Sequence, residues 1–184
     1  MLTSQLEIIE QGKLYLKSIS KEGYTAIISP NFMSSAGSHI RHIIDHYLAI
    51  ISGTENTLID YDVRERGSEI ESSPTLAINK FNEIARWIKS LSESELNKII
   101  TLTTEVSVTN KNVQKVQTSV ARELVFAGSH AVHHYAMIAQ ISFAQEADTQ
   151  QKPMPQAFGL APATATFMRQ NIDKPHTIKQ TVSQ

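Results

Sequence analysis

Two histidine-bearing stretches decide the fold: Arg122-Glu-Leu-Val-Phe-Ala-Gly-Ser-His-Ala-Val-His-His-Tyr-Ala-Met-Ile138 and Ser35-Ala-Gly-Ser-His-Ile-Arg-His-Ile-Ile-Asp-His-Tyr47. In each, apolar residues recur at the three- and four-residue spacing of an α-helix. The histidines in them are His39, His42 and His46 in the earlier stretch, and His130, His133 and His134 in the later one. Six of the seven histidines of the chain therefore lie on two predicted helices.

The rest of the chain predicts two further long helices and a small β-hairpin. We expect helices from a Thr3 cap to Ser18, from Ser34 or Ser35 to about Ile51, from Ser73-Pro74 to Leu91, and from Thr118 or Ser119 to about Glu146. Residues 24–30 read as an extended connection, and residues 54–72 as a long polar one. The β-branched runs 98–108 and 113–117 flank a turn and predict the hairpin.

This pattern predicts an all-α protein, with the hairpin placed before the last long helix. We expect a single domain over residues 1–170 and a loose tail over residues 171–184. After Asp148 the chain is rich in Gln and Pro, but residues 158–162 are expected to pack back and residues 163–170 to form one or two helical turns.

Composition narrows the classes of function. With 17 basic and 18 acidic residues, the chain lacks the basic excess expected of a nucleic-acid-binding protein. It has no cysteine, which excludes disulfides, thiolate zinc sites and cysteine nucleophiles. No secretory signal and no apolar run of membrane-spanning length is evident, so we expect a soluble, cytoplasmic protein that binds no membrane.

The spacing of the histidines predicts a metal site. His130 and His134 are four residues apart, so they share one face of a helix and can bind one ion together. On the earlier helix, His39, His42 and His46 fall within an arc of about 60°. Any one of these three can supply a third nitrogen from across the interior, and helical spacing does not choose among them. The simpler alternative, that these are hydrogen-bonded core histidines, carries comparable weight at this stage.

The two histidine stretches, together with Tyr61-Asp-Val-Arg-Glu-Arg66 and Phe158-Gly-Leu-Ala-Pro162, resemble the DinB-like (DinB/YfiT-like) family. The resemblance extends from about residue 29 to residue 167. It implies an up-and-down four-helix bundle with one long crossover, often dimeric, that binds zinc or nickel through three histidines. One ligand comes from the second helix and two come from the fourth.

Carried onto this sequence, the family pattern places the metal ligands at His42, His130 and His134. His46, one turn beyond His42, is the reserve ligand. His39 is expected to cap a helix or line the mouth of the site, and His133 to make an interhelical hydrogen bond.

Asp45 and Glu123 are candidates to orient the ligating imidazoles, because metal-bound histidines usually donate their second N–H to a carboxylate or carbonyl. Surface ion pairs are the simpler role for both. Arg64 and Arg66 are candidates for substrate binding, in a wall with Arg41, if their loop folds over the metal. The slightly favoured alternative is that they fix the loop by pairing with Asp62, Glu69 or Glu71.

The family resemblance implies a metal-dependent transferase that uses a low-molecular-weight thiol, or a hydrolase, acting on a small molecule. Lacking cysteine, the chain must receive any thiol as a cosubstrate. Catalytic residues are not identified from the sequence. The alternative is a non-catalytic, stress-related protein that binds a metal or ligand, and a metal-free protein with structural histidines is weaker.

Overall fold

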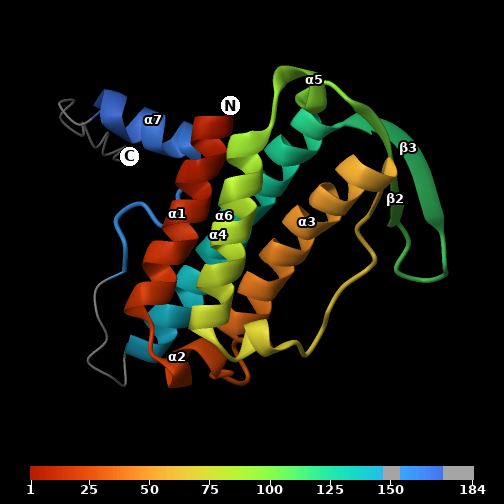
Figure 1. The fold of residues 1–184 in the computed structure, drawn as a ribbon. Helices are drawn as coiled ribbons and strands as arrows, with labels where there is room; N and C mark the ends of the chain where they lie inside the picture. The colour runs from red at the N-terminus through yellow and green to blue at the C-terminus, as the bar shows by residue number, and fades with distance from the viewer. Residues whose placement is uncertain (147–153, 172–184) are drawn as a thin grey trace, which may run out of the picture.

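The computed structural model describes residues 1–146 and 154–171, and the chain is mostly helical. Its long helices are α1 (Leu2–Ser18), α3 (Ala36–Asn56), α4 (Pro74–Ser90) and α6 (Val120–Glu146). Helix α3 packs against α4 and α6, and α1 packs against the same two helices, so the long helices enclose one interior (Figure 1). The shorter elements are α2 (Lys21–Thr25), the 3-10 helix η1 (Glu69–Glu71), α5 (Glu93–Leu96) and α7 (Pro162–Asn171).

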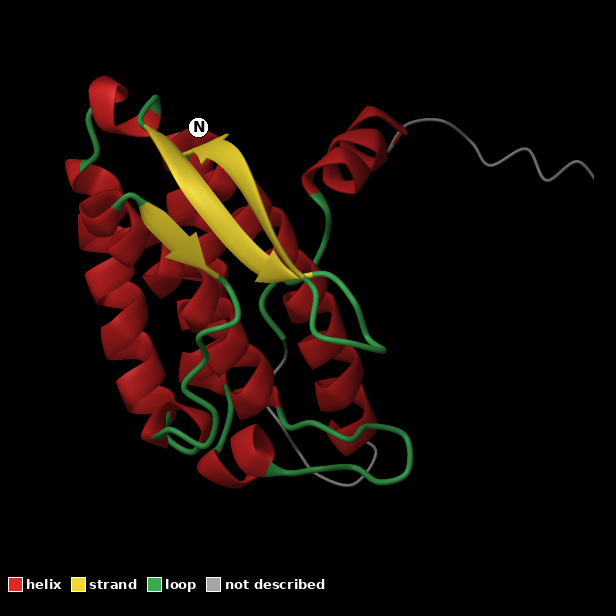
Figure 2. Cartoon of the chain, turned by 90° about the vertical axis from the view of Figure 1, so that its right-hand side faces the viewer, coloured by secondary structure: helices red, strands yellow, loops and turns green. Residues whose placement is uncertain are grey.

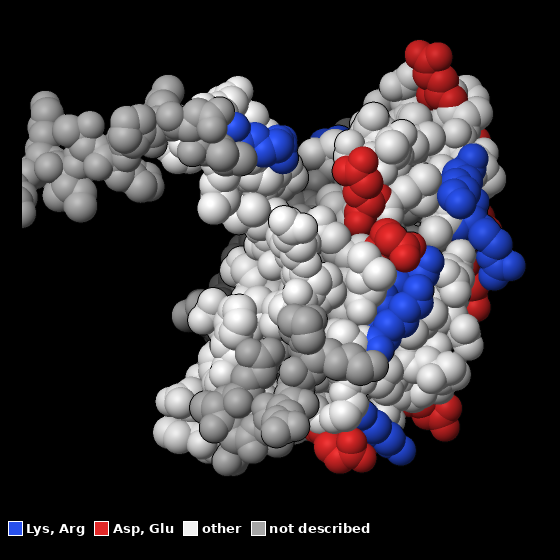
Figure 3. All heavy atoms as spheres, turned by 90° about the vertical axis from the view of Figure 1, so that its left-hand side faces the viewer, with Lys and Arg blue, Asp and Glu red and all other residues white. Residues whose placement is uncertain are grey.

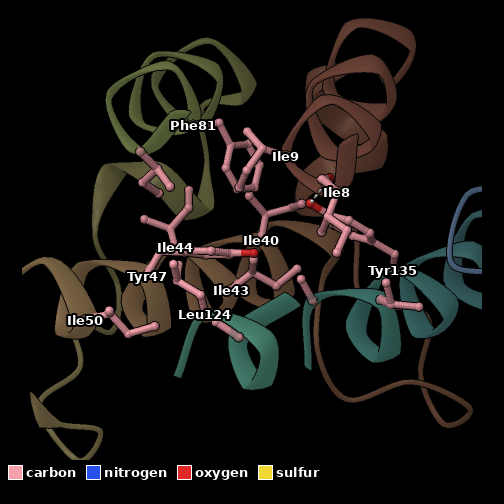
Figure 4. Packing of buried hydrophobic residues seen from close by; sticks show 14 of the residues in the cluster. Ile8, Ile9, Ile40, Ile43, Ile44, Tyr47, Ile50, Phe81, Leu124 and Tyr135 are labelled. Atoms are coloured by element: carbon pink, nitrogen blue, oxygen red, sulfur yellow. Dashed lines mark hydrogen bonds between the residues drawn. The ribbon is translucent and has the colours of Figure 1, made fainter. Parts of the chain in front are cut away.

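The core lies between these helices and is built largely from isoleucine and tyrosine (Figure 4). Tyr47 and Tyr135 are fully buried, and each hydroxyl has a partner. The Tyr47 hydroxyl donates to Gln5 Oε1 at 3.1 Å, and the Tyr135 hydroxyl donates to the Ile8 carbonyl at 3.2 Å. Burial of these rings therefore leaves no hydroxyl unsatisfied, which would otherwise cost free energy.

The predicted starts of the middle helices are confirmed. Ser35 and Ser73 occupy the N-cap positions of α3 and α4, and each hydroxyl accepts a hydrogen bond from the backbone N–H three residues later. The predicted Thr3 cap is wrong, because α1 already begins at Leu2 and has no side-chain cap.

Two predicted helix boundaries are also wrong. Tyr24 was expected in an extended connection but lies in the short helix α2, which Ser20 caps. The Ser52-Gly53 pair was expected to end the second helix, yet α3 continues to Asn56. A Cβ at Gly53 would stand 2.3 Å from Ile59 Cγ1, so this glycine serves close packing and not helix termination.

The predicted hairpin is present as β2 (Ile99–Glu105) and β3 (Val113–Ser119), which pair antiparallel. A third strand, β1 (Leu58–Asp60), pairs parallel to β2 with Leu58 opposite Thr101 and completes a sheet of order β1-β2-β3. The sheet lies across one side of the helices (Figure 2). The β1 strand comes from the long connection predicted as structureless, where three residues carry too little alternation to be recognised.

The connection after β1 is fixed to α3 through η1. Arg41 donates to Glu71 at 2.8 Å, and the Tyr24 hydroxyl donates to the Ile70 carbonyl at 2.8 Å. Gly37, in the first turn of α3, allows the approach, because a Cβ there would stand 2.0 Å from the Glu71 carbonyl oxygen. The connection is therefore held against the helix that carries three of the histidines.

Residues 158–162 pack back against the helices, and residues 162–171 form the helix α7, both as predicted. Phe158 stacks on Tyr15 and Tyr135, with ring centroids 4.9 and 4.8 Å apart. Gly159 has a φ of +72° and lies against the backbone of Ala136. Helix α7 follows and buries none of its residues, and the predicted loose tail lies outside the described residues apart from Asn171.

Acidic and basic side chains are interspersed on the face shown in Figure 3, without separation into regions of one sign. None of the described helices is both long enough and apolar enough to cross a membrane.

Replacing Gly37 by Ala should destabilise the protein by about 1–3 kcal/mol, because the new methyl group meets a backbone carbonyl that cannot move without shifting η1. Helix propensity alone predicts the opposite sign, a gain of up to about 1 kcal/mol. Urea unfolding followed by circular dichroism distinguishes the two. Gln140→Ala, on an exposed position of α6, is the control and should change stability by less than about 0.5 kcal/mol.

Candidate metal centre

The packing of α3 against α6 brings five histidines into one cluster. They are His39, His42 and His46 from α3, and His130 and His134 from α6. His42 Nε2 lies 3.0 Å from His130 Nε2, which in turn lies 3.0 Å from His134 Nε2. The Nε2 atom of His130 therefore lies between those of the other two histidines that the family pattern selected.

His46 forms a second, overlapping group. One ring nitrogen from each of His42, His46 and His130 lies within 4.8 Å of the others, a spacing that could hold a metal ion. His42 and His130 belong to both groups. The groups differ in the third histidine, which is His134 in the first and His46 in the second. In the first group, both 3.0 Å contacts are made by His130.

Hydrogen bonding alone does not account for this geometry. A neutral imidazole nitrogen either carries a proton and donates, or carries a lone pair and accepts. His130 Nε2 faces two other nitrogens at 3.0 Å and can make a full hydrogen bond with one of them. A cation bound between the three nitrogens accepts all three lone pairs, which removes the conflict.

The distances also fit a metal of ordinary size. Bonds of 2.0–2.1 Å from zinc to imidazole nitrogen place neighbouring nitrogens about 3.3 Å apart in a tetrahedral shell and about 2.9 Å apart in an octahedral one. The observed separations of 3.0 Å fall between these values. Imidazole donors suit zinc and nickel alike.

The environment keeps the imidazoles neutral, as metal binding requires. Burial is the largest cause that lowers the pKa of His42, His46 and His134 to about 3; neighbouring histidines contribute for all three, and Arg64 contributes for His42 and His46. The pKa values of His39 and His130 are lowered for the same reasons, with burial again the largest cause. At neutral pH each imidazole of the cluster is therefore uncharged. One of its ring nitrogens has a lone pair that can bind a metal, and the other carries a proton.

His39 orients His134, a role that the sequence did not predict. Its Nδ1 lies 2.8 Å from His134 Nδ1, and both side chains are buried. If His134 Nε2 binds the metal, its Nδ1 must carry the proton and would donate to His39 Nδ1. This contact takes the place that a carboxylate or carbonyl occupies beside most metal-bound histidines.

The two carboxylates expected in that orienting role have other partners. Asp45 accepts from Arg41 at 2.8 Å. Glu123, fully buried, accepts from the Tyr61 hydroxyl at 2.7 Å, from Thr118 at 2.6 Å and from Arg122 at 2.7 Å. None of the hydrogen bonds among the described residues joins either carboxylate to a histidine, so the expectation for these residues is replaced by the His39 contact.

Glu123 reaches the site indirectly, through Tyr61. The Tyr61 ring lies against His46, with centroids 4.8 Å apart, and against Phe126 at 5.6 Å. Phe126 in turn stacks on His130 at 5.7 Å. These two aromatic residues wall one side of the histidine cluster. The sequence predicts Tyr61 only as part of the polar connection 54–72, and it predicts no role for Phe126 beside the histidines.

The favoured pairing for Arg64 and Arg66 is wrong for the described part of the chain. Glu71 pairs with Arg41, and Asp62 accepts from the Glu105 backbone N–H at 2.8 Å. Arg64 and Arg66 are exposed, and Arg64 Nε donates to the Tyr61 carbonyl at 3.3 Å.

His133 is exposed on α6, and its side chain makes no hydrogen bond within residues 1–146 and 154–171, so the interhelical bond expected for it is absent there.

Replacing His39 by Ala should weaken zinc affinity by about 10- to 100-fold, because His134 loses the contact that orients its ring. Affinity is measured by competition with a chromophoric chelator. His39→Gln, whose amide oxygen can accept from His134 Nδ1, should recover part of the loss. His133→Ala is the matched control, and an equal loss there would refute the assigned role of His39.

Acid should destabilise the metal-free protein between about pH 6.5 and pH 3. The unfolded state protonates His46 near its ordinary pKa of 6.5, whereas the folded state holds that pKa at about 3. The unfolded state then binds more protons, so the free energy of unfolding falls as the pH falls through this range. With a chelator present, urea midpoints at about pH 7 and about pH 5 should differ less for His46→Leu than for the wild type. Equal differences in the two proteins would exclude His46 as a source of the acid sensitivity.

Comparison with known proteins agrees with this architecture. The computed fold is similar to the crystal structure of a DinB-like protein, YjoA, from Bacillus subtilis, with a TM-score of 0.57 and 15% sequence identity. The match covers 83% of this chain and 96% of that one. At this identity, the likeness concerns the fold alone.

The sequence is also similar to a curated protein, FK506-binding protein 5 of Rhizopus delemar, with 29% identity over 118 residues. The match covers 64% of this chain but 29% of the relative, so the chain spans less than a third of that protein's length. A model of the DinB family matches residues 10–142, which include all five clustered histidines. Because this match covers well over half of its length, the chain belongs to the DinB family.

Proposed function

We propose that this chain binds one divalent metal ion, zinc or nickel, through His42, His130 and His134, and uses it to act on a small-molecule substrate. The observation that carries the proposal is the position of His130 Nε2, which lies 3.0 Å from His42 Nε2 and 3.0 Å from His134 Nε2. The contact of His39 with His134 supports the choice of His134 as the third ligand. We assign the four long helices to the family's up-and-down bundle with a long crossover.

Three histidine ligands leave coordination positions open for a substrate. A bound divalent ion supplies Lewis acidity there and makes a coordinated thiol or water more acidic. The chain's own residues hold the ligands, exclude water on the side of Tyr61 and Phe126, and keep the imidazoles neutral.

The hydrogen-bond partners of the two nearby carboxylates favour a transferase that uses a low-molecular-weight thiol over a hydrolase. A hydrolase needs a base to accept a proton from water. Asp45 is held by Arg41, and Glu123 already accepts three hydrogen bonds, so neither carboxylate is free for this role. A thiol cosubstrate brings its own nucleophile and makes a weaker demand for a base.

A non-catalytic, stress-related metal-binding protein is the second candidate, and the position of His46 favours it. One of its nitrogens lies within 4.8 Å of nitrogens of His42 and His130. If His46 joins the other three histidines, the ion has four protein ligands and a closed shell, as in structural metal sites. We further propose a cytoplasmic protein that forms a homodimer and binds neither nucleic acid nor membrane.

Metal content tests the ligand set. Protein purified without an affinity tag should contain about one equivalent of divalent metal, and His42→Ala, His130→Ala and His134→Ala should each lose most of it. Elemental analysis by mass spectrometry gives the measurement, and circular dichroism checks that each variant is folded. The exposed His133→Ala variant is the control and should retain the metal.

His46→Ala separates the two candidates. Retention of the metal is expected for the open, three-histidine site, and loss of it favours the closed site. Equal metal content in the wild type and all the histidine variants would rule the ligand set out.

A further inference from the structure

A positive charge without a carboxylate partner lies beside the histidine cluster. Arg64 is exposed, and its Nε is tied to the carbonyl of Tyr61, whose ring lies against His46. Its remaining guanidinium N–H groups have no hydrogen-bond or ion-pair partner among the described residues. After burial, which is the largest cause, the charge of Arg64 helps to lower the pKa values of His42, His46 and His130. Its contact with Tyr61 therefore places Arg64 next to the aromatic side of the histidine cluster.

Asp45 and Glu123, the carboxylates expected beside the cluster, already have other partners. The other arginine that acts on the cluster, Arg41, is buried and neutralised by Asp45 and Glu71, each at 2.8 Å. Glu123 is enclosed by its three hydrogen-bond donors.

Neutral imidazole ligands leave the charge of a bound divalent ion undiminished. Carboxylate ligands, by contrast, would cancel part of it. An ion held by three histidines and flanked by Arg64 therefore presents two centres of positive charge to whatever enters the site. The planar guanidinium matches the geometry of a carboxylate and can bind it through two parallel hydrogen bonds.

We propose that the substrate or cosubstrate of this site is an anion that carries a carboxylate beside its metal-binding group, and that Arg64 binds that carboxylate. This inference rests on the proposed function, since it assumes a metal held by the histidine cluster. Arg66 is not part of it: although two residues away and exposed, it is not among the charges that act on the histidines.

Two small thiols that differ in charge test the inference. Mercaptoacetate and 2-mercaptoethanol are titrated separately into the cobalt-loaded protein, and binding is followed in the visible spectrum of the metal. Arg64→Ala should weaken mercaptoacetate binding about tenfold, the effect of losing a charge-assisted contact, and should leave mercaptoethanol binding nearly unchanged. Arg64→Lys should retain part of the preference for mercaptoacetate, because it keeps the charge but not the planar fork.

Arg66→Ala is the matched control and should behave like the wild type with both thiols. Added salt should reduce the effect of Arg64, because it screens an exposed charge. The inference is overturned if Arg64→Ala weakens both thiols equally or neither, while cobalt still binds and responds to thiol. If cobalt does not bind, or if neither thiol alters its spectrum in the wild type, the proposed function fails and the inference fails with it.

Discussion

The contact between α3 and α6 is the constraint on which the site depends. Neither helix alone brings three imidazole nitrogens to one point, because His130 and His134 share a face of α6 while His42 lies on α3. The surrounding isoleucines and tyrosines set the separation of the two helices, and so the distance from His42 Nε2 to His130 Nε2. A change in core packing that moved the helices apart by an ångström would alter the metal geometry without touching a ligand.

The helices and the histidine pairing could be predicted from the sequence because both follow helical periodicity. His130 and His134 stand one turn apart in any α-helix, and the caps at Ser35 and Ser73 are local signals. The third ligand could not be chosen in this way, because three histidines of α3 share one arc. That choice depends on how the helices are rotated against each other, which is a property of tertiary packing.

What was missed depends on contacts between residues distant in sequence. His39 meets His134 across 95 positions, and Tyr61 meets Glu123 across 62. No local pattern indicates that a histidine would take the place of Asp45 or Glu123 beside a metal ligand. The β1 strand was missed for the same reason, since its three residues are defined by pairing with β2 and not by their own sequence.

The connection between β1 and α4 can vary in sequence independently of the helices that carry the histidines. The pairing of β1 with β2 holds the start of this connection, and the Arg41–Glu71 ion pair holds its end. Arg64 therefore lies on a loop that is fixed at both ends. Loops of this kind accept sequence change more readily than the helices they join. The sequence of the loop between these two fixed points can therefore change, in nature or by design, and alter which ligand is bound. The helices that carry the histidines need not change with it.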